Sequence, residues 1–149
     1  MPTLIHVVYA SVAAQPFTNL ELAELLRQSR AANERIGVTG MLLYSSGNFF
    51  QVLEGDPATV DELFKKLSRD KRHRQLTMIV REPIARRSFA DWSMGFSNVT
   101  PEECARVEGL NDFFLDGSCF AELDSGRAKK LLAAFAAGCW RAKLTGMAA

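Results

Sequence analysis

Apolar residues recur along the chain with two different spacings, which predict alternating strands and helices. Residues 4–10 (LIHVVYA) are β-branched and apolar, and they predict a strand. Residues 18–34 (TNLELAELLRQSRAANE) carry leucines at helical spacing and predict a helix. Thr18, followed three residues later by Glu21, is typical of a capping box at the start of that helix.

A hairpin and a second helix follow. Residues 37–44 and 48–54 are apolar runs joined through SSGN, which predicts two antiparallel strands. Asp56 and Pro57 suit the N-cap and the first position of the next helix. The apolar stripe of this helix consists of Val60, Leu63, Phe64 and Leu67.

The remaining pattern completes an α+β fold. Strands are predicted at 76–84 (LTMIVREPI) and 91–97 (DWSMGFS), short helical turns at 101–115, and an amphipathic helix at 125–144. The order β-α-β-β-α-β-β is that of a ferredoxin-like plait with one extra strand. We expect both crossover helices on one face of the sheet, with the first strand at its centre beside the first strand of the hairpin. Because several strands are apolar on both faces, C-terminal helices should cap the other face. The predicted division is a domain at 1–98 and a helical extension at 99–149.

Composition narrows the class of protein. The chain has 149 residues, of which 48% are apolar and 23% charged, and this suits one soluble globular domain with a short appendage. The formal net charge of +1 gives no overall attraction to nucleic acid or acidic membranes. No signal peptide or membrane-spanning run is expected. Three scattered cysteines favour a reducing compartment, so we expect a cytoplasmic protein. With only two histidines and no clustered cysteines, we expect no metal site.

Several polar residues interrupt the apolar pattern. Gln51 stands between two apolar residues on one face of its strand, and a buried amide without partners costs roughly 1–3 kcal/mol. Tyr9 ends the first strand, while Ser29 and Asn33 continue the apolar stripe of the first helix and make its end polar.

Each of these residues has an ordinary interpretation. Tyr9 fits a core residue with its hydroxyl at the rim, and Asn33 fits the end of a helix. A one-residue change in strand register would turn Gln51 to solvent. Trp92 and Met94, on one face of the last strand, fit plain packing. The basic run at 65–74 fits a solvated helix end.

Their joint placement supports a binding site. In this topology Tyr9, Gln51 and the end of the first helix share a slot between the two helices. Leu25 and Leu67 would line the slot, with Asn33 and Gln51 at its polar edge. Each amide offers a donor and an acceptor, which suits the edge of a flat heteroaromatic ligand, and nearby basic residues suit phosphates. Spacing alone does not name the ligand.

The chain also resembles a known family, the BLUF domain, which senses blue light with a flavin. The resemblance covers roughly residues 3–97. It rests on the fragments LIHVVYAS, LLRQSRAANERIGVTGMLLYSSGNFFQVLEG, VDELFKKLSRDKRH and DWSMGF. The family holds FAD non-covalently between the helices of a ferredoxin-like plait, so the resemblance implies FAD as cofactor, with FMN or riboflavin as substitutes.

The resemblance assigns roles to individual residues. It implies a photoactive switch formed by Tyr9, Gln51, Trp92 and Met94. The implied flavin contacts are Tyr9, Leu25, Ser29, Asn33, Gln51, Lys66, Leu67, Asp70, Arg72 and His73. Ala32 stands where many relatives carry a polar residue.

The implied mechanism is that of a receptor rather than an enzyme. Excited flavin takes an electron and then a proton from Tyr9, with Gln51 as relay, and Gln51 ends in a new rotamer or tautomer. The last strand detects the change through Met94 or Trp92. The chain resembles short, stand-alone members of the family, so we expect signalling to an unknown partner protein through the C-terminal helices, and a homo-oligomer.

The sequence is also compatible with two other classes of protein. One is a ferredoxin-like module that binds another small molecule or RNA without photochemistry, although aromatic and basic residues are not interleaved as RNA binding would require. The other is a hydrolase of acyl phosphates. It would need an anion-binding loop, for which SSGN and ASVAAQP are poor candidates.

Overall fold

A computed structural model describes residues 3–15, 17–45, 47–90, 94–98, 120 and 123–136. The plait is built from β1 (Leu4–Ala13), α1 (Asn19–Ile36), β2 (Thr39–Ser45), β3 (Asn48–Gly55), α2 (Pro57–Ser68) and β4 (His73–Ile84). β5 (Gly95–Asn98) and α5 (Ser125–Ala136) follow. The predicted ferredoxin-like α+β fold with an extra strand is confirmed.

The sheet has the strand order β4-β1-β3-β2-β5. β3 is central and pairs antiparallel with both β1 and β2, while β4 pairs antiparallel with β1 and β5 pairs parallel with β2. The expectation that β1 lies at the centre beside the first strand of the hairpin is therefore wrong. The crossover through α1 places β2 one strand position away from β1. The hairpin then brings β3 into the position between them.

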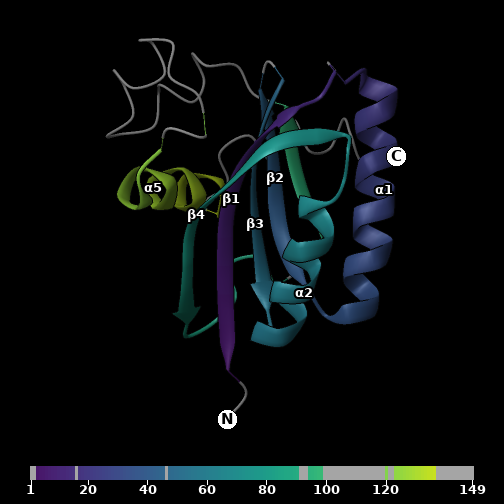
Figure 1. Ribbon diagram of the computed structural model, residues 1–149. Helices are drawn as coiled ribbons and strands as arrows, with labels where there is room; N and C mark the ends of the chain where they lie inside the picture. Colours follow the sequence, from purple (N-terminus) through teal and green to yellow (C-terminus); the bar gives the residue numbers. More distant parts are fainter. Residues whose placement is uncertain are drawn as a thin grey trace.

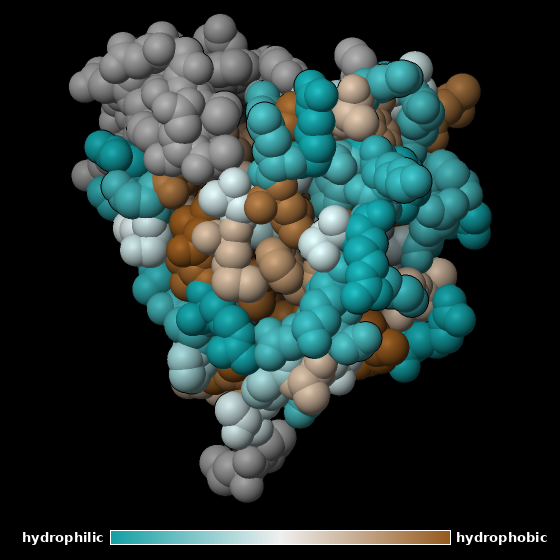
Figure 2. Space-filling model, viewed as in Figure 1, coloured by the Kyte–Doolittle hydropathy of each residue, from teal (hydrophilic) through white to brown (hydrophobic). Residues whose placement is uncertain are grey.

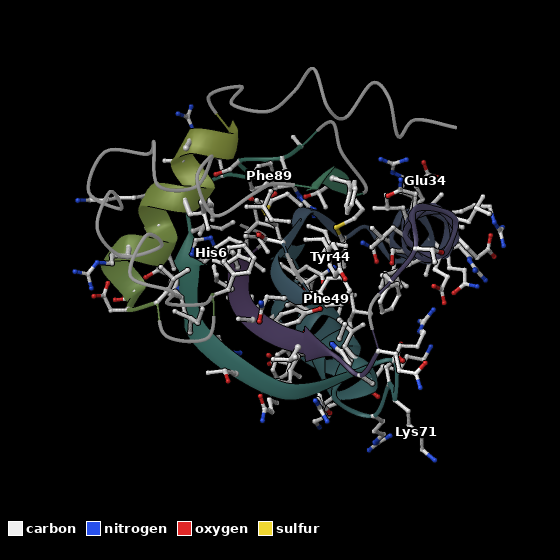
Figure 3. All side chains as sticks on the ribbon, turned by 90° about the horizontal axis from the view of Figure 1, so that it is seen from above. His6, Glu34, Tyr44, Phe49, Lys71 and Phe89 are labelled. Carbon is white, nitrogen blue, oxygen red and sulfur yellow. The ribbon has the colours of Figure 1, made fainter. Side chains whose placement is uncertain are left out.

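Helices cover both faces of the sheet (Figure 1). α1 and α2 lie on one face and α5 on the other. The α1–α2 face includes Tyr9, Leu26, Leu53 and Val60 in one buried cluster. On the opposite face, Leu131 and Leu132 of α5 pack in a second cluster with Phe50. Figure 3 shows the same division, with Tyr44 and Phe49 on the α1 side of the sheet and His6 towards α5.

Local signals place the starts of α1 and α2 as predicted, whereas α1 ends two residues later than predicted, at Ile36. Thr18 caps α1, and its side chain and that of Glu21 form the expected capping box. Gly37 ends α1 in the left-handed conformation at φ 71°, which a residue without Cβ adopts at little cost. Asp56 caps α2 by accepting from the amides of Ala58 and Thr59 at 3.1 and 3.3 Å.

Strand ends depart from the predicted ranges. β1 runs three residues further than predicted, to Ala13, and β4 begins three residues earlier, at His73, because these two ends pair with each other. β5 covers Gly95–Asn98, whereas residues 91–93 of the predicted strand lie outside the described residues. The turns expected at 101–115, the end of the last helix and all three cysteines also lie outside them. The boundary between 98 and 99 stays a prediction.

The face in Figure 2 carries hydrophobic side chains at its centre, ringed by hydrophilic ones. Within the described part of the chain, no helix is long and apolar enough to cross a membrane. The same residues contain no cluster of three or more His, Cys, Asp or Glu side chains that could hold a metal ion.

Candidate functional site

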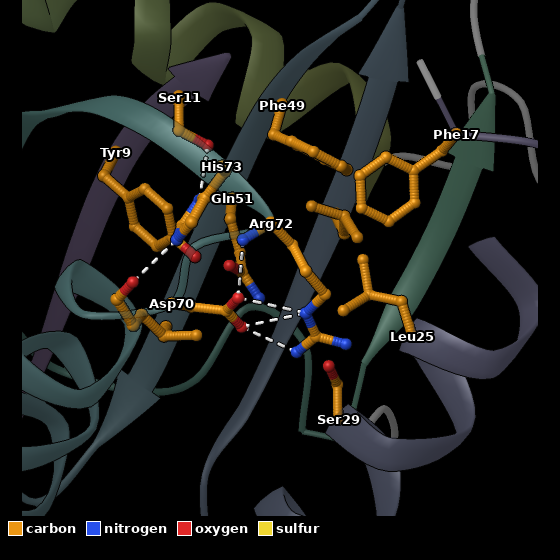
Figure 4. Close-up of a pocket in the computed structure, with 12 residues that line it drawn as sticks. Tyr9, Ser11, Phe17, Leu25, Ser29, Phe49, Gln51, Asp70, Arg72 and His73 are labelled. Carbon is orange, nitrogen blue, oxygen red and sulfur yellow. Dashed lines mark hydrogen bonds and ion pairs between the residues drawn. The ribbon is translucent and has the colours of Figure 1, made fainter. Parts of the chain in front are cut away.

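The candidate site is a set of adjoining cavities beside the sheet, between α1 and the end of α2. The central cavity measures about 40 Å³ and is drawn in Figure 4. Two recesses of about 370 Å³ each adjoin it through shared lining residues. We name them the Asn33 recess and the Glu24 recess after one residue of each. Arg72 borders all three cavities.

Tyr9 and Gln51 form the inner wall of the central cavity. They are direct partners on β1 and β3, and their exposed fractions are only 2% and 7%. The register that would turn Gln51 to solvent is therefore excluded. Burial raises the pKa of the Tyr9 phenol above its ordinary value, and the negative charge of Asp70 raises it further. Tyr9 is thus a neutral proton donor at all physiological pH values.

The polar atoms of this pair are only partly satisfied by the protein. Gln51 Nε2 donates to Met94 Sδ at 3.5 Å, a long contact to a weak acceptor. Among the described residues, nothing hydrogen-bonds to the Tyr9 hydroxyl or donates to Gln51 Oε1. Buried polar groups are normally paired, so two such atoms facing one cavity fit a site that binds a polar ligand.

α1 provides the second wall. Leu25 and Ser29 line the central cavity one helical turn apart, and Asn33, one turn further, lines the Asn33 recess together with Gln51. Asn33 is 3% exposed, so its amide faces the protein interior rather than solvent. The stripe that becomes polar at the end of the helix therefore turns towards the cavities, as predicted.

The turn between α2 and β4 closes the site. Leu67, Asp70, Arg72 and His73 line the central cavity, and Lys66 lines the Asn33 recess. All ten residues predicted to contact a ligand thus border one set of cavities. Whether they contact a flavin stays a prediction.

Arg72 crosses the mouth of the site. Its guanidinium pairs with Asp70 at 2.6 Å and also donates to Gln28 Oε1 of α1 at 3.1 Å. The hydrogen bonds from Arg72 hold the pKa of Asp70 below its ordinary range, and Asp70 raises the pKa of Arg72. Asp70 therefore stays ionised, and Figure 4 shows the pair in front of Gln51.

His73 is held by both ring nitrogens. Nε2 lies 2.6 Å from the backbone oxygen of Leu67, which can only accept, so Nε2 carries a proton. Nδ1 lies 2.8 Å from Ser11 Oγ. The ring therefore ties the start of β4 to α2 and to β1.

Sequence reasoning missed four residues that line the central cavity: Ser11, Phe17, Leu42 and Phe49. Two of them had a signal, since Ser11 is two residues after Tyr9 and Phe49 two before Gln51, and alternate strand residues share a face. Phe17 lies before the cap of α1 and has no periodic signal. Its amide donates to Tyr44 Oη at 3.2 Å, which places its ring against Phe49.

The last strand is only partly described. Met94 is 2% exposed and lies beside Gln51, as the predicted switch requires. Trp92, the fourth residue assigned to that switch, lies outside the described residues.

A family model described as "BLUF: Sensors of blue-light using FAD" matches residues 4–95. The chain belongs to the BLUF family. BLUF domains sense blue light with a flavin, so residues 4–95 of this chain form a flavin-based blue-light sensor domain. The resemblance drawn from the sequence is confirmed.

Curated relatives of this BLUF protein include light-regulated enzymes. It is 38% identical to the photoactivated adenylate cyclase subunit alpha of Euglena gracilis over 109 residues, which are 73% of this chain and 11% of that subunit. It is 42% identical to the subunit beta of Euglena longa over 78 residues, 52% of this chain and 9% of that subunit. The likeness therefore covers only a small part of each cyclase subunit.

Solved structures match over more of their length. The dark-state structure of BlrB, a BLUF protein, is 31% identical and superposes with a TM-score of 0.74, covering 92% of this chain and 98% of BlrB. The ground state of BlsA is 27% identical with a TM-score of 0.74, covering 89% and 87% of the two chains. The superposition thus covers nearly the whole BlrB chain and most of the BlsA chain.

Proposed function

We propose that this chain binds FAD between α1 and α2 and signals by a light-driven rearrangement of the Gln51 side chain beside Tyr9. The observation that carries the proposal is the buried Tyr9–Gln51 pair, whose hydroxyl and amide oxygen face one cavity without a partner among the described residues. An inner wall of this kind leaves hydrogen-bonding capacity for a ligand.

The lining suits a flavin in chemical terms. Asn33 and Gln51 each offer a donor and an acceptor to the polar edge of a flat ring, and Leu25 and Leu67 supply apolar walls. Lys66 and Arg72 border the recess that also contains Asn33, and their charges suit phosphate groups. These cations favour FAD or FMN over riboflavin, and we propose FAD as the natural form.

Bound flavin would supply absorption of blue light and an excited state that accepts electrons. Tyr9 lines the central cavity, holds its proton at the phenol oxygen in the dark and would donate an electron and a proton. The two polar atoms of the Gln51 amide differ chemically, because Oε1 only accepts and Nε2 only donates. Rotation or tautomerisation of this amide therefore changes the hydrogen bonds offered to Tyr9 and Met94. A buried amide with two arrangements is a two-state element of the kind that a switch requires.

We propose that output runs through β5 and the C-terminal helices to a partner protein. α5 packs on the sheet face opposite the cavities, where Leu131 and Phe50 share a cluster. The central β3 strand carries Gln51 to one face and Phe50 to the other. In this proposal the chain signals by contact, as a cytoplasmic homo-oligomer, and performs no enzymatic reaction itself.

The alternative of an RNA-binding plait has less support. Such modules stack bases on exposed aromatic residues of the sheet. Here α5 covers the sheet face opposite α1 and α2, and the aromatic residue at its centre, Phe50, is fully buried.

The test is spectroscopic. The purified chain, reconstituted in turn with FAD, FMN and riboflavin, should give a flavin absorption spectrum that shifts reversibly to the red under blue light. FAD should bind most tightly, as measured by fluorescence titration. A flavin spectrum that blue light leaves unchanged would refute the proposal, and tightest binding of riboflavin would refute the role assigned to the cations.

A further inference from the structure

The backbone of Met94 is hydrogen-bonded to a side chain of α1. Arg30 Nε donates to the Met94 carbonyl oxygen at 2.9 Å, in a partly buried position, across 64 residues of sequence. Met94 immediately precedes β5, a strand of four residues. Because β5 is so short, a single strong contact at its first end has a large influence on where Met94 lies.

The side chain of the same residue reaches Gln51. Met94 Sδ accepts from Gln51 Nε2 at 3.5 Å, and Met94 belongs to the buried cluster that includes Tyr9 and Leu42. Met94 is thus attached at two points, by its carbonyl oxygen to α1 and by its sulfur to β3. Thioethers are flexible and make weak acceptors, so the sulfur contact alone would fix its position poorly.

The contact of Arg30 is of a different kind from the ion pairs that several other arginines form, and among the described arginines Arg87 also donates to a backbone oxygen, that of Glu54 at 3.1 Å. Arg27, Arg72 and Arg81 each pair with a carboxylate. Arg30 instead places its charged donor on a neutral backbone oxygen, and hydrogen bonds to charged groups are stronger than those between neutral groups. An arginine used in this way fixes a backbone position rather than balancing charge.

We infer that Arg30 is a positioning residue that keeps the Met94 sulfur beside the Gln51 amide in the dark arrangement and thereby sets the rate of dark recovery. This inference rests on the proposed function. Rearrangement of Gln51 removes the donor from Met94 Sδ, whereas the bond from Arg30 to the Met94 carbonyl does not involve Gln51. With Arg30 present, the sulfur stays ready to accept again. Without it, the sulfur is less often in place to accept from Gln51 as the amide returns, so the barrier to the dark arrangement rises and recovery slows.

The experiment measures dark recovery of the flavin absorption after a blue pulse in four full-length proteins. These are the wild type, Arg30→Gln, Met94→Leu and the double variant. Leucine keeps the volume of methionine but has no sulfur acceptor. We expect Arg30→Gln to slow recovery about three- to tenfold in the wild-type background and to have less than half that effect, on a logarithmic scale, beside Met94→Leu. Arg35→Gln, at an exposed position in the last turn of α1, is the matched control and should recover at the wild-type rate.

Every outcome decides the inference. Unchanged recovery in Arg30→Gln overturns it. An equal slowing in both backgrounds also overturns it, because Arg30 would then act without the sulfur, as a merely structural residue would. If Arg30→Gln does not fold, Arg30→Lys takes its place, since lysine retains one charged donor, and an intermediate slowing that Met94→Leu removes supports the inference. Absence of any red shift in the wild type refutes the proposed function instead, so the two failures are distinguishable.

Discussion

Tyr9 and Gln51 are direct partners across the β1–β3 ladder, and both side chains face the helices α1 and α2 from within the protein. Neighbouring positions on these strands are filled by apolar residues such as Val7 and Leu53. The pair is therefore a buried polar site in a largely apolar sheet face. Asp70 and Arg72 lie in front of it, at the mouth of the site (Figure 4).

Removal of the Tyr9 hydroxyl should abolish the photoresponse. In Tyr9→Phe the flavin still binds, because the ring is retained, but the phenol no longer supplies an electron and a proton. We expect no reversible red shift and stronger flavin fluorescence than in the wild type. Tyr44→Phe is the matched control. Its hydroxyl accepts from the Phe17 amide rather than facing Gln51, so the red shift should persist. A red shift of normal size in Tyr9→Phe would contradict the role of Tyr9.

Replacement of the Gln51 amide by an apolar side chain should separate binding from switching. Gln51→Leu removes a buried amide of which, within the described part of the chain, only one group has a protein partner, so the free energy of unfolding should change by less than about 1 kcal/mol. Flavin should remain bound, and its light-induced red shift should be lost. Light-minus-dark absorption difference spectra measure the outcome. A persistent shift would show that Gln51 is not the switching group.

Glu54 is expected to anchor the segment that leads to β5. Its carboxylate is fully buried and accepts from Thr39 Oγ1 at 2.9 Å and from the amides of Ser88 and Phe89 at 2.7 and 3.0 Å. In Glu54→Gln one acceptor becomes a donor and opposes at least one of these groups. The free energy of unfolding should fall by roughly 1–3 kcal/mol, measured by urea denaturation.

The control for this change is Glu62→Gln, on the exposed surface of α2, which should alter stability by no more than about 0.5 kcal/mol. Equal stabilities of the two variants would contradict the anchoring role of Glu54.

Acid should weaken the Asp70–Arg72 pair. Because the hydrogen bonds from Arg72 lower the pKa of Asp70 in the folded protein, the pair stabilises the fold above the ordinary pKa of aspartate. That contribution is lost as the pH falls through the lower, folded-state pKa. The pair is partly exposed, so the contribution should stay below about 1 kcal/mol. The stability difference between wild type and Asp70→Asn should therefore shrink towards zero between about pH 5 and pH 2. A difference that grows on acidification would contradict the assignment.

Removal of a large side chain from α5 should destabilise the protein without altering the flavin site. Leu131 is fully buried on the face opposite Tyr9, in the cluster with Phe50. Leu131→Ala should cost roughly 2–5 kcal/mol of unfolding free energy, with a red shift of normal size. Lys130→Ala, at an exposed neighbouring position, is the control and should change stability little. A loss below about 1 kcal/mol would indicate that α5 contributes little to the core.

Much of the candidate site could be predicted from local pattern together with family resemblance. Leu25, Ser29 and Asn33 follow one another at helical spacing, so their common direction towards the cavities follows from the period of α1. The hydrogen bond of Ser11 to another strand could not be predicted in the same way. Its partner His73 is 62 residues away, and β4 had to begin at His73 for the two to meet.

By itself, the sequence determined the elements, their caps and the two-sided apolar character of the strands. These depend on contacts between residues three or four positions apart and on the alternation of side chains within a strand. Only the tertiary structure decided that β3 lies between β1 and β2, that Gln51 faces inward opposite Tyr9, and that Met94 meets both Gln51 and Arg30. These contacts join segments far apart in the chain, and they form only when the core as a whole buries its apolar faces.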